Sequence, residues 1–332
     1  MPPVSDSGDS FQARFERRWS HLTQPHVRAL AWLLDAPDLL DPACALWHRQ
    51  IASLGPVTPA TAVWLMAQER DPAPLLAALG SRPYCRLGLY AEKLMAFYFE
   101  QHGLLLAHGL QVRAGRNDTV GEFDFLLRCG PSLLHWEFAT KFYLLEGAGQ
   151  SPLDPLDRLV GPNLEDTLGL KMRKILDQQL ALGRHPAAQR LLPQPVARAQ
   201  ALVKGWLFYP GRVAPAIAGL APVHCHGFWC ALAQAGSMSG AGDLFVLLPR
   251  MQWLAPWKAA AGSDVALLSP AQLQAMLAAR FESAAAPVLV AQVRQKGAWL
   301  LEQQRGFIVP DDWAAQAARQ RATDRSKRIV NA

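Results

Sequence analysis

The sequence contains no uninterrupted run of about twenty apolar residues, the length that a membrane-spanning helix requires. Its polar and charged start, MPPVSDSGDSFQARFERRW, has no apolar segment typical of a signal peptide. We therefore expect a soluble, cytoplasmic protein with no membrane partner. The five cysteines are odd in number and scattered through apolar segments, which argues against a disulfide framework and favours reduced thiols that pack as small core residues.

Several catalytic signatures are missing as well. There is no GxxxxGK[ST] phosphate loop, no GxGxxG turn, no GxSxG elbow and no HExxH motif, which leaves serine-hydrolase and zinc-protease functions without support. The segment His224-Cys225-His226, followed by Cys230, offers zinc ligands. On a strand, however, Cys225 and His226 point to opposite faces, and no second cluster completes a tetrahedral site, so buried packing is the favoured interpretation.

About half of the 332 residues are hydrophobic, enough to bury a substantial core in one elaborated domain or two compact ones. The formal net charge is +6 and the sequence pI is about 9.2. An excess of positive charge favours an anionic partner such as nucleic acid, although a modest excess on a large surface also serves solubility alone.

Apolar periodicity divides the chain into three regions. Residues 1–86 are expected to form an N-terminal helical region, residues 87–210 an α/β core, and residues 211–332 a C-terminal α/β extension packed on that core. The helices expected in the first region cover 26–40, 41–55 and 58–70. In the last region, strands are expected at 226–234 and 243–254, and helices at 269–284 and 311–328.

The core begins with an apolar helix at 87–102, after which the hydrophobic period changes from helical spacing to two. Three segments with that period, 104–115, 121–130 and 132–144, are joined by short links and predict an antiparallel three-strand meander. A helix at 164–183 and a strand at 201–210 follow. This order suggests a crossover that returns to the same sheet, so we predict an α/β fold.

Acidic and basic residues share one face of the second and third strands. Alternation groups Asp124 with Glu122 on the second strand, and Glu137 with His135 and Lys141 on the third. If these strands pair as a hairpin, Asp124 and Glu137 lie opposite each other and supply the hard oxygen ligands that Mg²⁺ or Mn²⁺ prefers. Lys141 is a candidate for stabilising the charge that develops on a phosphate under attack. A solvated surface ion pair is the alternative interpretation.

This pattern resembles the PD-(D/E)XK, or restriction-endonuclease-like, nuclease superfamily, whose core runs helix, three-strand meander, helix, strand. The resemblance implies metal ligands at Asp124 and Glu137, catalytic roles for those acids and for Lys141, and a further acid at Glu92. It also implies substrate-binding groups on the following helix, where Lys171, Lys174 and Gln178 lie. Over most of its length the chain also resembles a bacterial family of unknown function, which implies no particular activity.

One departure from the superfamily pattern affects the expected activity. The third strand reads Glu137-Phe138-Ala139-Thr140-Lys141, so Ala139 occupies the usual lysine position. The leading hypothesis is a metal-dependent nuclease that acts on DNA in preference to RNA. The displaced lysine supports an alternative, an inactive nuclease-fold protein that serves as a scaffold for nucleic acid or protein. A metal hydrolase for a small phosphorylated substrate is a third possibility.

Overall fold

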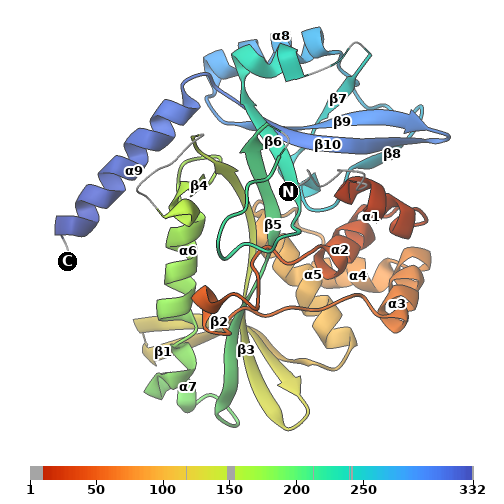
Figure 1. Ribbon diagram of the computed structural model, residues 1–332. Helices are drawn as coiled ribbons and strands as arrows, with labels where there is room; N and C mark the ends of the chain where they lie inside the picture. Colours follow the sequence, from red (N-terminus) through yellow and green to blue (C-terminus); the bar gives the residue numbers. More distant parts are fainter. Residues whose placement is uncertain are drawn as a thin grey trace, which may run out of the picture.

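The computed structural model describes residues 10–116, 118–147, 154–211, 213–238, 240 and 242–330, with the backbone alone at 237, 238 and 323–330. Across these ranges the chain forms a mixed α/β fold around one ten-stranded sheet (Figure 1). Along its main path the strand order is β1-β2-β3-β5-β6-β10-β9-β7, with β4 paired to β3 and β8 to β10. The strands are β1 (Leu105–Gly115), β2 (Asp118–Cys129), β3 (Ser132–Leu145), β4 (Leu159–Val160), β5 (Val196–Pro210), β6 (His226–Ala231), β7 (Leu244–Leu247), β8 (Lys258–Ala260), β9 (Val288–Lys296) and β10 (Trp299–Val309).

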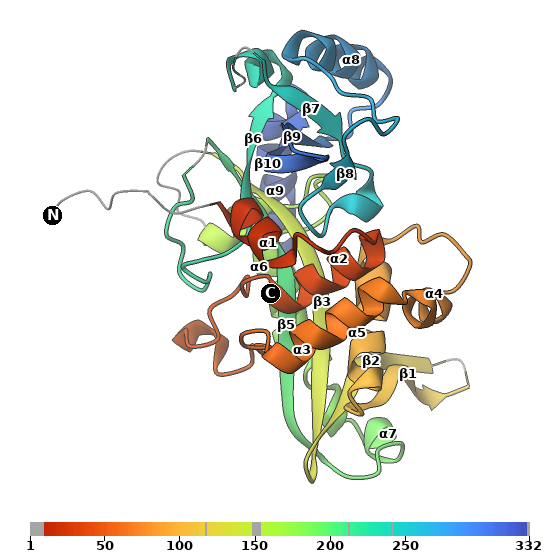
Figure 2. The ribbon, with the colours of Figure 1, turned by 90° about the vertical axis from the view of Figure 1, so that its right-hand side faces the viewer.

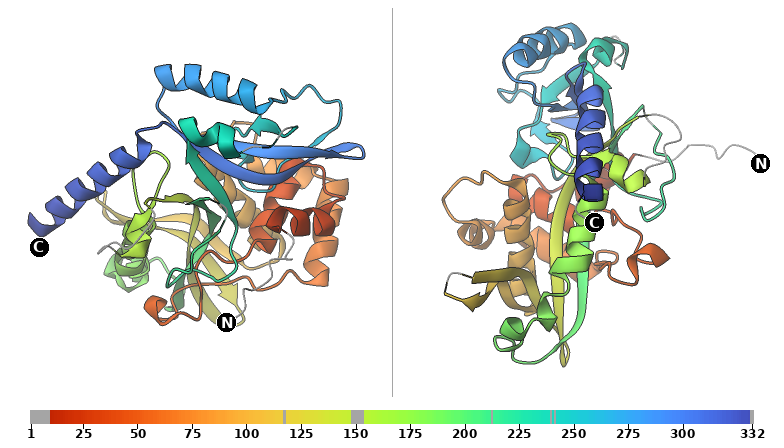
Figure 3. Two further views of the ribbon diagram at one scale, coloured as in Figure 1. Left: turned by 45° about the horizontal axis from the view of Figure 1, so that its top comes forward. Right: turned by 90° about the vertical axis from the view of Figure 1, so that its left-hand side faces the viewer.

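Helices cover both faces of the sheet. Figure 1 shows α2 and α5 on one side of β3 and β5 and α6 on the other, and Figure 2 shows α2 and α5 in front of these strands. Figure 3 shows α9 projecting from the body at the C-terminal end. The α-helices are α1 (Phe11–Trp19), α2 (Pro25–Asp35), α3 (Pro59–Arg70), α4 (Ala73–Leu79), α5 (Leu87–Gln101), α6 (Leu168–Lys174), α7 (Pro186–Gln189), α8 (Pro270–Ser283) and α9 (Trp313–Val330).

The central meander and crossover are as expected from the sequence. β1, β2 and β3 pair in antiparallel fashion, and β5 returns after α6 to pair with β3 in parallel. The close approach of β3 and β5 depends on Gly205, because a Cβ at that position would overlap the carbonyl oxygen of Lys141. The same sheet continues beyond residue 210, since β6 pairs in parallel with both β5 and β10.

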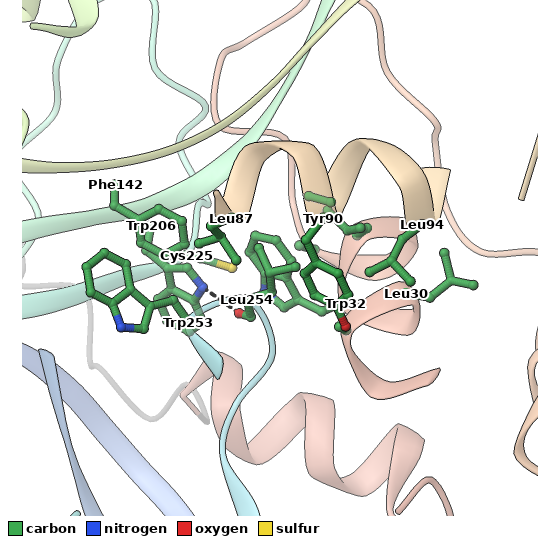
Figure 4. Packing of buried hydrophobic residues seen from close by; sticks show 14 of the residues in the cluster. Leu30, Trp32, Leu87, Tyr90, Leu94, Phe142, Trp206, Cys225, Trp253 and Leu254 are labelled. Carbon is green, nitrogen blue, oxygen red and sulfur yellow. Dashed lines mark hydrogen bonds between the residues drawn. The ribbon is translucent and has the colours of Figure 1, made fainter. Parts of the chain in front are cut away.

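The largest hydrophobic core lies between the sheet and the N-terminal helices (Figure 4). Trp206 of β5 stacks on Trp32 of α2, with ring centroids 6.3 Å apart, and donates its indole N–H to the carbonyl of Leu254 at 2.9 Å. The guanidinium of Arg305 on β10 lies 4.2 Å from the Trp206 ring centre. Residues from all three sequence regions therefore pack around one tryptophan.

The helix expected at 41–55 does not form. Only a short turn at Ala45–Trp47 is helical, and His48 and Arg49 follow with positive φ angles of 49° and 61°. The backbone of the next residues bonds to β5 instead, because Ala52 N–H donates to the carbonyl of Ala201 at 2.9 Å. This segment covers the part of β5 that precedes its pairing with β6. The backbone hydrogen bonds to β5 therefore outweigh the local helical pattern of residues 41–55.

The last third of the chain was predicted incompletely. β6, β7, α8 and α9 correspond to expected elements, but the β9–β10 hairpin was missed. Its sequence pattern is interrupted because Glu302 and Arg305 are buried on β10, where they form an ion pair of 2.7 Å.

The thiols are free, as expected, but only Cys225 and Cys230 are buried in the core. Cys85 is exposed in a loop, and Cys129 is exposed at the end of β2.

Candidate active site

Asp124 and Glu137 meet where the pairing of β2 with β3 ends. The ladder runs from Cys129–Ser132 to Phe125–Trp136, so its next step would bring Asp124 opposite Glu137. In place of a further ladder bond, the Oδ2 atom of Asp124 accepts a hydrogen bond from the backbone N–H of Phe138 at 2.9 Å. The hairpin register that the sequence suggested therefore brings the two acids together at the opening between the strands.

The carboxyl of Asp124 sits in an environment that disfavours its charge. Burial raises its pKa to about 8, with further increases from the negative charges of Glu137 and, less strongly, Glu92. The Phe138 N–H and the ammonium of Lys171 oppose the shift. At neutral pH, without an added cation, Asp124 is therefore largely protonated. A bound cation would favour its ionised form.

Glu137 is the most enclosed acid of the site, with 1% of its surface exposed. Its Oε1 atom lies 2.8 Å from Nε2 of the fully buried His135, and its Oε2 accepts a hydrogen bond from the amide of Gln179 at 2.5 Å. Within the described residues, Nδ1 of His135 has no hydrogen-bond partner. The His135 and Gln179 contacts hold the Glu137 carboxylate in one orientation. Gln179 lies on the helix expected to add polar groups to the site, but Gln178 was the glutamine predicted to do so.

Glu92 enters the site from the opposite helical layer. It lies on α5, and its Oε1 atom is 2.6 Å from Nε2 of His108 on β1. Its charge acts on Asp124, which places it near the same acidic centre. His108 was missed because nothing in the sequence pattern of β1 indicates which neighbouring helix its side chain meets.

The two lysines of the site differ in their partners. The Lys171 amine donates to Oε1 of Gln179 at 3.4 Å. Burial lowers the pKa of Lys171, as does the nearby charge of Lys141, whereas Asp124 and Glu137 raise it. Lys141 instead donates to Oδ2 of Asp166 at 2.9 Å. Lys171 is therefore tied through Gln179 to Glu137, while Lys141 is held by an acid outside the pair.

Lys174 and Gln178, expected to face the substrate, occupy exposed positions. Lys174 is the last residue of α6, and for Gln178 the cause is a π-helical turn at Ile175–Gln179, which follows α6 directly. Such a turn adds a residue to the helical repeat, so Gln179, instead of Gln178, lies on the same face of the helix as Lys171. A regular helix, as the sequence predicted, would have favoured Gln178.

The donor set suits a hard divalent cation only in part. Carboxylate oxygens from Asp124 and Glu137 are the ligands that Mg²⁺ and Mn²⁺ favour, and the raised pKa of Asp124 fits a position that a cation stabilises. In the part of the chain that the structure describes, no group of three or more His, Cys, Asp or Glu side chains is arranged to hold a metal. Two carboxylates with water or substrate oxygens would therefore have to complete the coordination.

The protein is therefore an α/β protein in which Asp124 and Glu137 lie together where the pairing of β2 with β3 ends, with Lys171 close by. The chain belongs to the DUF1853 family, described as a domain of unknown function, whose model matches residues 28–309. Neither the curated proteins nor the solved structures yielded a match to this chain. Among the helices in the described ranges, none is both long and apolar enough to cross a membrane.

Proposed function

We propose that the protein is a divalent-metal-dependent nuclease that hydrolyses phosphodiester bonds, in DNA more readily than in RNA. The observation that carries this proposal is the convergence of Asp124 and Glu137, two buried or partly buried carboxyls, at the point where β2 and β3 part. An acid whose pKa is raised by burial and by a neighbouring carboxyl, as that of Asp124 is, is characteristic of functional centres.

Asp124 and Glu137 are the residues that would hold Mg²⁺ or Mn²⁺. Such an ion would supply Lewis-acid activation of the phosphodiester and of the attacking water. His135 and Gln179 keep the Glu137 carboxylate in place, and Lys171 brings a positive charge close to both acids. That amine is suited to stabilising the additional negative charge of the phosphate as the bond breaks.

The arrangement of elements supports the same proposal. α5, the β1–β2–β3 meander, α6 and the parallel strand β5 follow the order that the PD-(D/E)XK resemblance implies, with the acids on the second and third strands. The usual lysine position holds Ala139, which is buried, and Lys171 on α6 occupies the space near the acids. A lysine contributed by the helix would compensate for the departure on β3.

The test is cleavage of linear duplex DNA, single-stranded DNA and RNA by the purified full chain with Mg²⁺ or Mn²⁺. Asp124→Asn is expected to abolish cleavage, because it removes a metal ligand and keeps an acceptor for the Phe138 N–H. Glu122→Gln is the matched control, since Glu122 is exposed on the same strand. A wild-type protein that cleaves none of these substrates, or an Asp124→Asn variant as active as the control, would refute the nuclease proposal.

A specific observation favours a second candidate, a nuclease-fold scaffold without chemistry. The Lys141 amine is occupied by Asp166, which also accepts a hydrogen bond from the Tyr143 hydroxyl at 3.0 Å. In this case nucleic-acid binding would be independent of Mg²⁺ and would survive Asp124→Asn. Titration of wild type and variant with labelled DNA, with and without Mg²⁺, separates the two functions.

A further inference from the structure

A cavity of about 510 Å³ lies where the three sequence regions meet. Its walls come from the start of α2, from the end of α4 and the loop after it, from Tyr90 of α5 and from the segment at 251–258 that leads into β8. None of the acids of the candidate active site belongs to its lining, so the cavity is separate from that site. Its volume is typical of sites that bind a small molecule, and such sites are common where separate parts of a fold join.

Buried charged groups fix the wall that leads into β8. Arg28 donates to the carbonyl oxygen of Pro256 at 3.1 Å, and the backbone N–H of Trp257 donates to Oε2 of Glu302 at 2.8 Å. Glu302 is held in turn by its ion pair with Arg305. Because backbone atoms of this wall are bonded to buried side chains that are themselves paired, the cavity is part of the folded structure and does not need a ligand to form.

Flat and apolar side chains make up much of the interior. The rings of Tyr84 and Trp257 line the cavity together with Leu76 and Leu254, and both rings are partly exposed. Tyrosine and tryptophan rings pack well against other flat rings, including those of nucleic-acid bases. The interior is therefore suited to an aromatic ligand.

A hydrogen-bonded pair of polar side chains lines the same cavity. Nδ1 of the partly exposed His26 lies 2.8 Å from the hydroxyl oxygen of the buried Tyr90, and neither side chain forms another hydrogen bond to a described residue. Burial lowers the pKa of His26 and raises that of Tyr90, so both are neutral near pH 7. Nε2 of His26 then remains as a donor or, in the other tautomer, as an acceptor. A nitrogen in the ring of a ligand would suit either form.

The charges around the cavity favour an anion. Arg28, Arg82 and Lys258 belong to its lining, whereas among the described residues no Asp or Glu does. Glu16 lies outside the lining and pairs with Arg28 at 3.3 Å and with Lys258 at 2.8 Å, so two cations share one carboxylate. Burial lowers the pKa of Arg28 in spite of the acids nearby, which indicates that its charge is not fully compensated. Arg82 is exposed and has no partner among the described residues, so it can meet an acidic group directly.

We propose that this cavity binds a small heteroaromatic acid. The flat ring of the ligand packs against Tyr84 and Trp257, and a ring nitrogen bonds to His26. A carboxylate or phosphate group on the ligand lies towards Arg82, in the positive field of the buried cations. Nucleotides and heteroaromatic carboxylic acids share this chemistry. The site goes beyond the proposed nuclease function and does not depend on it.

The experiment is isothermal titration calorimetry of the full chain in EDTA with two matched pairs of probes. AMP is compared with adenosine, and indoleacetate with indoleacetamide, so that each pair differs in its acidic group. The acid of at least one pair is expected to bind at least about tenfold more tightly than its uncharged counterpart. Preference for AMP identifies a nucleotide site, and preference for indoleacetate a site for a carboxylic acid. If neither acid binds at millimolar concentration, or if acids and uncharged probes bind equally, the proposal is wrong.

Two variants locate the bound acid. Leu76 lines the cavity and is 42% exposed, so Leu76→Trp should fill the cavity without disturbing the core and lower the affinity at least about tenfold. Val63→Trp on α3, at a position 67% exposed and outside the lining, is the matched control and should bind normally. Unchanged affinity in Leu76→Trp, or equal losses in both variants, would mean that the acid binds elsewhere and would overturn the proposal.

Arg82→Gln tests how the acidic group is recognised. It should remove most of the preference for the acid and leave the affinity of the uncharged probe unchanged, whereas Arg190→Gln, at an exposed position next to α7, should change neither. A full preference for the acid in Arg82→Gln would contradict the assigned orientation of the ligand. The two proposals fail separately, because a protein that binds the acid in this cavity but cleaves no nucleic acid refutes the nuclease alone.

Discussion

Replacing Asp124 by Asn should remove the part of the pH dependence of stability that Asp124 contributes. The folded state raises the pKa of Asp124 from its usual 3.8 to about 8, chiefly through burial and then through Glu137. Between these two values the folded protein binds more protons at this site than the unfolded chain does. Linkage then requires the contribution of Asp124 to stability to be fully present below about pH 4 and to be lost as the pH rises to about 8.

The size of the effect follows from the pKa values. At about 1.4 kcal/mol for each pKa unit, the upper limit is roughly 6 kcal/mol. The side chain keeps some exposure, and solvent screening reduces the cost of its charge, so we expect roughly 2–4 kcal/mol. Asn has nearly the same shape, remains neutral at every pH and can accept the Phe138 N–H. The variant should therefore match the wild type near pH 4 and exceed it in stability near pH 9.

The assay is urea denaturation of both proteins at several pH values between 4 and 9, without divalent metal. The difference between their free energies of unfolding cancels the titration of all other groups. Glu122→Gln, at an exposed position on β2, serves as the control and should give a flat difference. Parallel stability profiles for Asp124→Asn and wild type would refute the conclusion that burial and Glu137 disfavour the charged form of Asp124.

Two other predictions test the site and the sheet. Lys171→Met should lower kcat/KM for DNA cleavage by at least about a hundredfold, and by more than Lys141→Met does. The reason is that the charge of Lys171 acts on Asp124 and Glu137, whereas the Lys141 amine is paired with Asp166. An equal or larger loss in Lys141→Met would refute the proposal that Lys171 is the amine that stabilises the phosphate. Gly205→Ala should lower the free energy of unfolding by about 1–3 kcal/mol, since its methyl group would overlap the backbone of β3. Gly88→Ala on α5 should raise the free energy of unfolding by about 0.5–1 kcal/mol, because alanine favours the helix and its methyl group has room. Thermal and urea melts measure both changes, and a Gly205→Ala variant as stable as the wild type would contradict the close approach of β3 and β5.

The meeting of Asp124 and Glu137 was predictable because a short hairpin link allows little choice of register. Once Cys129 pairs with Ser132, the positions opposite each other follow by counting. On β3 the alternation also grouped Glu137 with His135, whereas on β2 it fails at Phe123, which packs with Leu126 and not with Phe125. Local sequence therefore carried the information for this part of the site.

Other parts of the site depend on tertiary packing and left no local signal. The π-helical turn that selects Gln179 is one residue different from a regular helix, and no residue type marks it. Asp166 meets Lys141 from a loop whose path depends on β3 and α6. On β10, Glu302 and Arg305 interrupt the apolar pattern, and no local signal in the sequence marks their pairing inside the sheet.

The packing of Trp206 has a practical consequence for experiments on fragments. Its ring is covered by Trp32 from the N-terminal helices and by Arg305 and Leu254 from the C-terminal part of the chain. Truncation to residues 87–210 would strip away these neighbours and expose a large aromatic surface together with the unpaired edge of β5, conditions that promote aggregation. Loss of activity in such a fragment would report misfolding, so point variants of the intact chain are the informative reagents.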